Sequence, residues 1–229
     1  IAAVGVSTEN TGSVFFDGTE DYLTATGPGA LGTGGDFTWE AWVYPVGDIS
    51  SETGRVVSAN LSAHTGEGTM IRYRNGGWQF QVGDQASNAL TSPIPATGNS
   101  WYHVALTRTG AIDPAVFRGF VNGTMVWEQT DSSNTDVNIT QFVIGWGFSS
   151  QYARGYISNV RFINGTSLYT ENFTPPIREL EIVDDTVLLA CYDGENIFAE
   201  KTGNVIAAYG DRLSSPTPTA TDSPIGITT

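Results

Sequence analysis

The pattern that most constrains the fold of this chain is a succession of short alternating runs from Ser13 onward, separated by Gly, Asn, Asp and Ser. In the clearest run, FTWEAWVYP, the odd-numbered residues from Phe37 to Val43 are apolar and share one face. Alternation with period two is typical of a half-buried β-strand. No segment of ten or more residues holds a convincing apolar repeat of period 3.6. The sequence therefore predicts an all-β protein, in which any helix is a short turn near Ser167 to Tyr169.

Two Asn-Gly pairs indicate tight hairpins. The first lies in NGG between Arg74 and Trp78, and the second is Asn122–Gly123 in FVNGTMV. Asn and Gly tolerate the positive φ that two-residue hairpin turns require. Many short strands joined in this way form two packed sheets. We therefore predict a two-sheet antiparallel β-sandwich, whose core and sheet-packing residues include Trp39, Trp42 and Trp101.

The composition divides the chain into one large domain and two arms. A length of 229 residues suits a single β domain, because sandwiches often reach this size. We predict an N-terminal arm (1–12), a β-sandwich domain (13–192) and a C-terminal extension (193–229). The extension ends in SSPTPTATDSPIGITT, which has too little apolar surface to form a core. Such an arm is either a flexible terminus or a segment that orders on a neighbouring subunit.

The charge balance excludes several partners. Only 10 Lys and Arg residues face 24 Asp and Glu residues, which gives a formal charge of -14. This charge repels phosphate backbones and anionic membranes, so we expect no nucleic-acid binding. No stretch reaches the roughly 18 apolar residues needed to cross a bilayer, so we expect no membrane insertion. The single cysteine, Cys191, cannot form an internal disulfide and is interpreted as a small buried residue.

Several phrases together carry a family resemblance. VFFDGTEDYLTA, GDFTWEAWVYP, WYHVALTRTG and FVNGTMV are followed by VIGWGFSSQYARGYISNVRFINGTSLYTENFTPP. In order and spacing, the region from Ser13 to Cys191 resembles the laminin G-like or concanavalin A-like jelly-roll family. Its closing phrase, followed by DDTVLLACY, resembles the variant common in structural proteins of tailed bacteriophages, especially marine ones. That variant implies a strand Gly155 to Ile163 that completes a sheet, then a crossing held extended by Pro175 and Pro176, then a last strand TVLLACY.

The resemblance implies a non-catalytic structural or adhesion protein on the surface of a tailed-phage virion. It would be a capsid decoration, a head appendage or a tail-fibre domain. The expected partners are other virion proteins, copies of itself in an oligomer, and a host-surface glycan. The alternative is a carbohydrate-binding or adhesion module of a bacterial surface protein or secreted glycosidase, located outside the cell. Animal laminin G modules commonly carry a disulfide, which this sequence cannot form, so a virus-like or bacterial source is favoured.

Enzymatic activity is not expected, although enzymes share this architecture. Glycosidases need an acid and a nucleophile on one cleft, about 5 Å apart in the retaining case. In ELEIVDDTV, Glu179 and Glu181 share one side but lack a third carboxylate at strand spacing, and Glu40 stands alone on its strand. Neither His64 nor His103 has a nearby Ser or Cys in a nucleophile context. Both histidines are interpreted as structural.

Family members often hold one structural Ca²⁺ at the sheet rim, which the resemblance implies for this chain. The matching positions are Asp17 and Asp21 in FDGTEDY, with Asp193 where the last predicted strand ends. Calcium prefers carboxylate and carbonyl oxygens. The alternative is that Asp17 and Gly18 form a turn, since Asp bonds its own backbone there.

The loop GWGFSSQYARG is the candidate ligand site, because in relatives it lies near the ligand rim. It holds three aromatic residues and one cation: Trp146, Phe148, Tyr152 and Arg154. Clustered aromatic rings beside an arginine could stack sugar rings or dock the edge of a protein. The alternative is that Trp146 caps the end of the sandwich.

Overall fold

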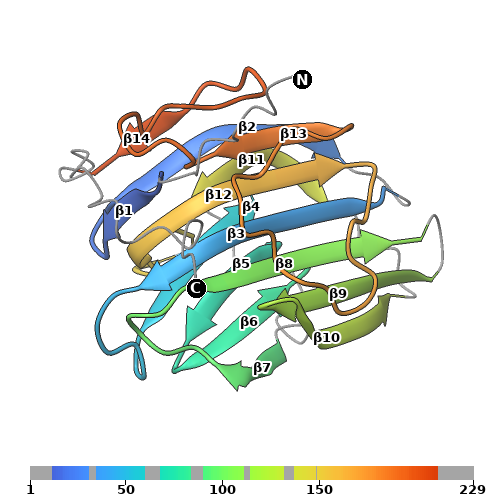
Figure 1. The fold of residues 1–229 in the computed structure, drawn as a ribbon, viewed down its shortest axis with the longest axis horizontal. Coiled ribbons are helices and arrows are strands. Elements are labelled where there is room, and N and C mark those ends of the chain that lie inside the picture. The colour runs from blue at the N-terminus through green and yellow to red at the C-terminus, as the bar shows by residue number, and fades with distance from the viewer. Residues whose placement is uncertain are drawn as a thin grey trace, which may run out of the picture.

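The computed structural model describes residues 12–30, 35–59, 68–83, 90–110, 114–131, 137–147 and 149–210 (Figure 1). Its regular elements are strands: β1 (Val14–Asp17), β2 (Tyr22–Ala30), β3 (Phe37–Pro45), β4 (Thr53–Ala59), β5 (Met70–Arg74), β6 (Gly77–Gln81), β7 (Leu90–Pro95), β8 (Tyr102–Thr109), β9 (Ala115–Val121), β10 (Thr124–Asp131), β11 (Asn138–Ile144), β12 (Arg154–Asn164), β13 (Thr186–Ala190) and β14 (Ala207–Tyr209). The described residues include no helix, and hence none that could span a membrane. The predicted all-β class is confirmed.

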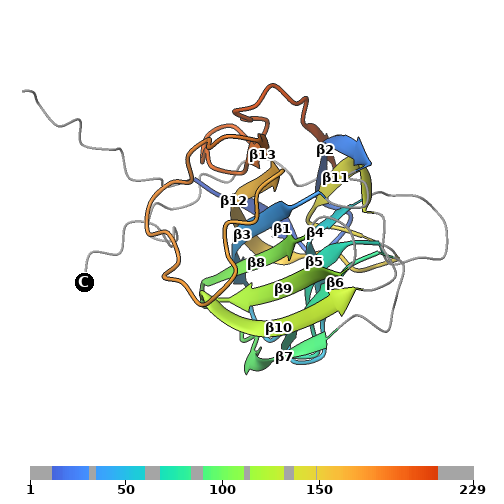
Figure 2. The same ribbon diagram turned by 90° about the vertical axis from the view of Figure 1, so that its right-hand side faces the viewer.

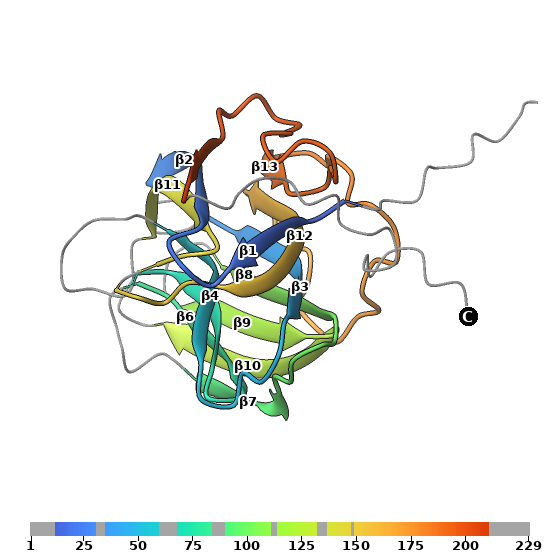
Figure 3. The same ribbon diagram turned by 90° about the vertical axis from the view of Figure 1, so that its left-hand side faces the viewer.

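The strands form two antiparallel sheets. Sheet A has the order β1-β12-β3-β8-β9-β10, with β13 also paired to β12, and sheet B has the order β14-β2-β11-β4-β5-β6-β7. Figures 2 and 3 show the two sheets from either side, as layers that face each other. The predicted two-sheet sandwich is therefore confirmed.

The core lies between the sheets, and β3 shows how the sequence builds it. Its odd-numbered residues from Phe37 to Val43 are buried against the core, as their alternation predicts. Trp39 is fully buried, and its ring meets Phe142 of β11 and Phe162 of β12 edge-on, each at 5.8 Å between centroids. These contacts join the two sheets, because β11 belongs to sheet B and β12 to sheet A.

Both predicted hairpin turns are confirmed. Asn75 and Gly76 join β5 to β6 with φ of 48° and 72°, and Asn122 and Gly123 join β9 to β10 with φ of 50° and 74°. Only a residue without Cβ fits at Gly123, since an added Cβ would lie 1.9 Å from the carbonyl oxygen of Phe173. The second turn is thus also the place where the later segment around Phe173 packs against Gly123.

Residues 165–181, here called the strap, cross the outer face of sheet A. Figure 1 shows this segment in front of β3 and β8, and Figure 2 shows it outside the sheet. The Thr107 hydroxyl of β8 donates to the Tyr169 carbonyl at 2.9 Å, and the Phe173 amide donates to the Gly123 carbonyl at 2.9 Å. The predicted crossing of the outer face is confirmed, but the strap is not extended throughout, because it bends at Thr170 and Glu171 and the rings of Tyr169 and Phe173 stack at 3.6 Å.

The prediction that the strand Gly155 to Ile163 closes a sheet is wrong. β12 has β3 along one side, while β1 and β13 follow one another along its other side. The register places Val14 opposite Ile157 and Ala190 opposite Val160. Two short strands distant in sequence therefore share one long neighbour, and β12 is interior.

The strand predicted to be last, TVLLACY, is followed by another. In β14, Tyr209 pairs with Tyr22 of β2, so the C-terminal extension adds a strand to sheet B. Up to Gly210 the extension is continuous with the jelly roll. Of the predicted N-terminal arm only Gly12 is described, and its carbonyl accepts the Ser158 hydroxyl at 2.6 Å. Residues 1–11 and 211–229 lie outside the described residues.

Cys191 follows β13 directly and is 2% exposed. Burial raises the pKa of its thiol to about 12, so the group stays protonated at neutral pH. Its interpretation as a small buried residue is confirmed.

Replacing Trp39 by Ala should lower the free energy of unfolding by about 3 to 5 kcal/mol, because it leaves a large cavity between the sheets. Urea denaturation followed by circular dichroism measures this. Trp101→Ala removes a partly exposed tryptophan and should cost clearly less. A loss below about 1 kcal/mol for Trp39→Ala would contradict its place in the core.

Candidate functional site

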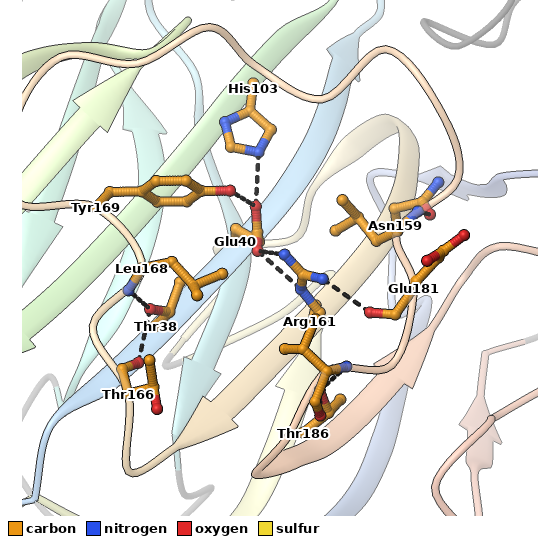
Figure 4. A network of polar contacts seen from close by, with 12 residues as sticks. Thr38, Glu40, His103, Asn159, Arg161, Thr166, Leu168, Tyr169, Glu181 and Thr186 are labelled. Atoms are coloured by element: carbon orange, nitrogen blue, oxygen red, sulfur yellow. Dashed lines mark hydrogen bonds and ion pairs between the residues drawn. The ribbon is translucent and has the colours of Figure 1, made fainter.

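A buried carboxylate lies at the centre of the outer face of sheet A. The Glu40 side chain is fully buried, and each of its oxygens accepts two hydrogen bonds. Oε2 accepts from His103 Nε2 at 3.0 Å and from the Tyr169 hydroxyl at 2.9 Å. Oε1 accepts from Arg161 Nε at 2.9 Å and Nη2 at 2.5 Å. Figure 4 shows these four residues, the Glu40 network, converging from β3, β8, β12 and the strap.

The contacts of the network shift the pKa values of Glu40 and Tyr169. Burial by itself would raise the pKa of Glu40, but the hydrogen bonds and charges of His103 and Arg161 outweigh it and hold that pKa below its usual value. Burial and the neighbouring Glu40 carboxylate raise the pKa of Tyr169. At neutral pH Glu40 is therefore a carboxylate and Tyr169 a neutral phenol that donates to it.

The strap closes this network from outside. Arg161 Nη1 donates to the Glu181 carbonyl at 2.8 Å, and the Leu168 amide donates to the Thr38 hydroxyl at 2.8 Å. The residue types suit acid–base chemistry, but no substrate can reach a carboxylate that is fully buried and bound by four donors. We assign the network a structural role. The sequence showed that Glu40 has no second carboxylate on its strand, but its partners lie on other elements and were missed.

Four aromatic rings form a second feature, here called the aromatic stack. Tyr209 of β14 and Tyr22 of β2 are parallel, with centroids 4.5 Å apart and planes within 5°. Tyr22 meets Trp146 at 4.7 Å and 39°, and Trp146 meets Tyr152 at 5.6 Å and 13°. The stack therefore joins the C-terminal extension, the start of β2 and the loop between β11 and β12 on the outer face of sheet B.

Backbone and polar contacts hold the loop that carries Trp146. β11 ends at Ile144, and Gly145 follows it with a φ of 86° at a place where a Cβ would lie 2.5 Å from the Phe16 ring. The Trp146 carbonyl accepts the Ser58 hydroxyl at 2.6 Å, and its indole Nε1 donates to the Ser149 carbonyl at 2.7 Å. The indole is thus fixed in one orientation before any ligand binds.

The stack remains accessible to solvent. Tyr209 is 45% exposed, and Tyr22, Trp146 and Tyr152 are partly exposed. The nearly parallel Trp146 and Tyr152 rings have centroids 5.6 Å apart, farther than the about 3.5 to 4 Å of direct face-to-face contact, so neither ring fully covers the other. Burial raises the pKa values of Tyr22 and Tyr152, so both phenols stay neutral and can donate hydrogen bonds. The stack combines apolar faces with polar tips.

The structure brings together two of the four predicted ligand residues. Trp146 and Tyr152 are neighbours in the stack, whereas Arg154 begins β12 in sheet A, and its guanidinium lies 3.7 Å from the Glu52 carboxylate. Phe148 lies outside the described residues. Sequence reasoning missed Tyr22 and Tyr209, because only the pairing of β14 with β2 places them beside the loop.

The three aspartates expected at a calcium site do not form one cluster. Asp17 and Asp21 share a turn, in which Asp17 Oδ1 accepts the Thr19 amide at 2.7 Å and Asp21 Oδ2 accepts the Asp17 amide at 3.2 Å. Asp193 Oδ1 instead accepts the amides of a separate turn after β13. The described part of the chain holds no group of three metal-binding side chains. The turn interpretation of Asp17 fits these contacts, and the structural Ca²⁺ stays a prediction.

The chain matches the concanavalin A-like lectin/glucanases superfamily over residues 17–169, in its laminin G grouping. The chain belongs to this family. No curated protein matches it in sequence.

Two solved structures show the same fold at low sequence identity. A Bacteroides ovatus protein assigned to carbohydrate binding aligns with a TM-score of 0.60 and 15% identity, over 89% of this chain and 60% of that protein. A heptameric SAP-like pentraxin from Limulus polyphemus aligns with a TM-score of 0.53 and 15% identity, over 91% of this chain and 100% of its own. The chain thus spans 60% of the length of the first of these proteins.

Replacing Glu40 by Gln should lower the free energy of unfolding by about 3 to 5 kcal/mol, because it leaves the Arg161 charge buried without its carboxylate. Thermal and urea denaturation at pH 7 measure this. The control Glu128→Gln removes the partner of Arg118 in a pair whose Glu128 side chain is 50% exposed, and should cost about 0 to 1 kcal/mol.

The pH dependence of the same variant tests the sign of the effect. The folded-state pKa of Glu40 lies below that of an unfolded glutamate, about 4.3. Its stabilising contribution is complete above that pH and is lost as pH falls through the folded pKa. The stability difference between wild type and Glu40→Gln should therefore shrink in acid. A constant difference from pH 7 to pH 3 would contradict this assignment.

Proposed function

We propose that this chain is a non-enzymatic glycan-binding and adhesion module that binds sugar through the aromatic stack. The observation that carries the proposal is the set of partly exposed rings, Tyr22, Trp146, Tyr152 and Tyr209, held on the outer face of sheet B. A pyranose ring offers a face of C–H groups and a rim of hydroxyls. The uncovered ring faces suit the former and the phenol hydroxyls suit the latter.

The immobilised indole supports binding over simple capping. Because Trp146 Nε1 is already bonded to the Ser149 carbonyl, its ring loses little conformational freedom when a sugar packs on it. If the stack served only to cap the end of the sandwich, its rings would be expected to be buried. Tyr209, at the end of the stack, is instead 45% exposed. Membership of a family that includes lectins agrees with the proposal.

The carboxylates named in the sequence support a non-catalytic role. Glu40 is sealed beneath the strap, and Glu179 lies outside the described strands with its carboxylate paired to Lys201. Neither forms an open acid and nucleophile pair of the kind that glycoside hydrolysis requires. Binding without turnover is therefore the activity that these residues favour.

Binding to a glycan array followed by isothermal titration calorimetry tests the proposed function. Wild type should bind at least one oligosaccharide, and Trp146→Ala should weaken that binding about tenfold or more, by about 1.4 kcal/mol. Phe198→Ala removes a 53% exposed aromatic side chain outside the stack and should leave affinity unchanged. An array on which wild type binds no glycan would contradict the proposal.

We further propose that the module is displayed on the surface of a tailed-phage particle, as a capsid decoration, head appendage or tail-fibre domain. The support is the phrase from Gly155 to Pro176, which resembles phage structural proteins and here forms most of β12 and the strap. Its partners there would be other virion proteins and further copies of itself. The alternative is a module on a bacterial surface protein or a secreted glycosidase.

Immunogold electron microscopy of particles from the native source distinguishes these locations. Antibodies against the folded domain should label the heads or tails of intact particles at regular positions. Label on bacterial cells or in the culture fluid, with none on particles, would favour the alternative.

A further inference from the structure

A second row of aromatic rings crosses the outer face of sheet A. It contains Phe15 of β1, Tyr156 of β12, Tyr44 of β3 and Trp101, which precedes β8. Neighbouring ring centroids are 5.0, 6.0 and 5.3 Å apart. We call these four residues the aromatic ladder.

The strand register produces this ladder. Phe15 lies opposite Tyr156, and Tyr156 lies opposite Tyr44. The pairing of Val43 with Tyr102 then places Trp101 beside Tyr44. Directly opposite residues point to the same face, and the alternation that sends Val43 to the core sends Tyr44 outward.

The ladder and the strap occupy different parts of the same face. The strap covers the part with Glu40 and His103, whose side chains are fully buried. All four ladder residues are partly exposed. Three interstrand spacings make the row about 14 Å long, so it is suited to a chain of sugars rather than to one ring.

The charges at the ladder select against an acidic ligand. Arg154, two residues before Tyr156, is 48% exposed at its side chain, but its guanidinium is paired with the Glu52 carboxylate at 3.7 Å. Asp17, opposite Arg154 in the register, adds a negative charge. The chain as a whole carries a formal charge of -14. A polyanion would therefore meet repulsion, and the part of the chain that the structure describes places no unpaired cation beside the row.

The side-chain chemistry favours a glycan over an aliphatic protein surface. The ladder consists of Phe, Tyr and Trp, and three of its four rings carry a polar atom that can bond a hydroxyl. Neighbouring rings of the row are inclined to one another by 54° to 70°, so successive rings can meet C–H faces and hydroxyl groups at different points along a polysaccharide.

We propose that the aromatic ladder is a second glycan-binding surface, for an uncharged linear polysaccharide chain that lies across β1, β12, β3 and β8. This inference rests on the proposed function and extends it. The ladder and the aromatic stack lie on the outer faces of opposite sheets, so one molecule would hold two glycan chains. Such bivalency strengthens attachment without any change in either site.

Affinity electrophoresis of the full chain in gels containing neutral polysaccharides tests this inference. The probes are soluble β-glucan, mannan and dextran as neutral polymers, and alginate and polygalacturonate as acidic ones. Wild type should be retarded by at least one neutral polymer and by neither acidic one. Tyr44→Ala and Trp101→Ala should each weaken that retardation about tenfold. Circular dichroism confirms folding, and Tyr44→Phe, which keeps the ring, should retain most of the binding if Tyr44→Ala fails to fold.

The controls separate this inference from the proposed function. Phe198→Ala should bind as wild type does. If Trp146→Ala loses binding while both ladder variants keep it, the ladder proposal is overturned and the stack remains the glycan site. If wild type binds no polysaccharide and no glycan, both proposals fail. Two further results would overturn the ladder proposal. One is retardation of the wild type by an acidic polymer that the ladder variants abolish. The other is that the ladder variants change only the self-association of the protein, as measured by analytical ultracentrifugation.

Discussion

The hydrogen bonds of the buried Glu40 carboxylate are the interaction on which the outer face of sheet A and the strap depend. A carboxylate without water is tolerated only when hydrogen-bond donors and opposite charge surround it. Here the donors come from β8, β12 and the strap, so the charge on one strand fixes the position of three other segments. Through Tyr169, the network holds the strap across sheet A although the strap forms no strand. The alternation of apolar and polar residues stops after Asn164 because the chain leaves the sheet there.

The course of the strap decides which surfaces remain for binding. One part of the outer face of sheet A is sealed by Tyr169 and Phe173, whose rings are parallel at 3.6 Å. The remaining part presents the aromatic ladder, and the aromatic stack lies on the outer face of sheet B. The proposed binding surfaces are thus separated from the buried polar network. Aromatic residues therefore have two roles. Tyr169 and Phe173 enclose the buried network, whereas the partly exposed rings of the ladder and the stack are available for binding.

Local patterns predicted the local structure well. The two faces of β3 and both Asn-Gly turns follow from alternation and from positive φ, which depend on neighbouring residues alone. The crossing of the outer face followed from the family resemblance, whereas the bend at Thr170 and Glu171 was not predicted. The resemblance also identified Trp146 and Tyr152, which the structure places side by side in the aromatic stack.

Long-range pairing could not be predicted in the same way. The contact of Tyr209 with Tyr22 requires β14 to pair with β2, and the three-residue β14 has no alternation long enough to read. The donors to Glu40 are separated from it by 63 to 129 residues. Arg154 is two residues from Tyr152, yet their side chains have different partners, because β12 begins at Arg154 and Tyr152 still belongs to the loop.

The most direct test of glycan binding at the stack is the movement of indole resonances in the ¹H–¹⁵N NMR spectrum during titration with a neutral oligosaccharide that the protein binds. The Trp146 Nε1 resonance should shift, because its ring lies in the stack, while those of Trp39 and Trp78, which are fully buried, should stay unchanged. A Trp146 resonance that does not move as the oligosaccharide saturates the protein would contradict the assignment of the stack as the binding site.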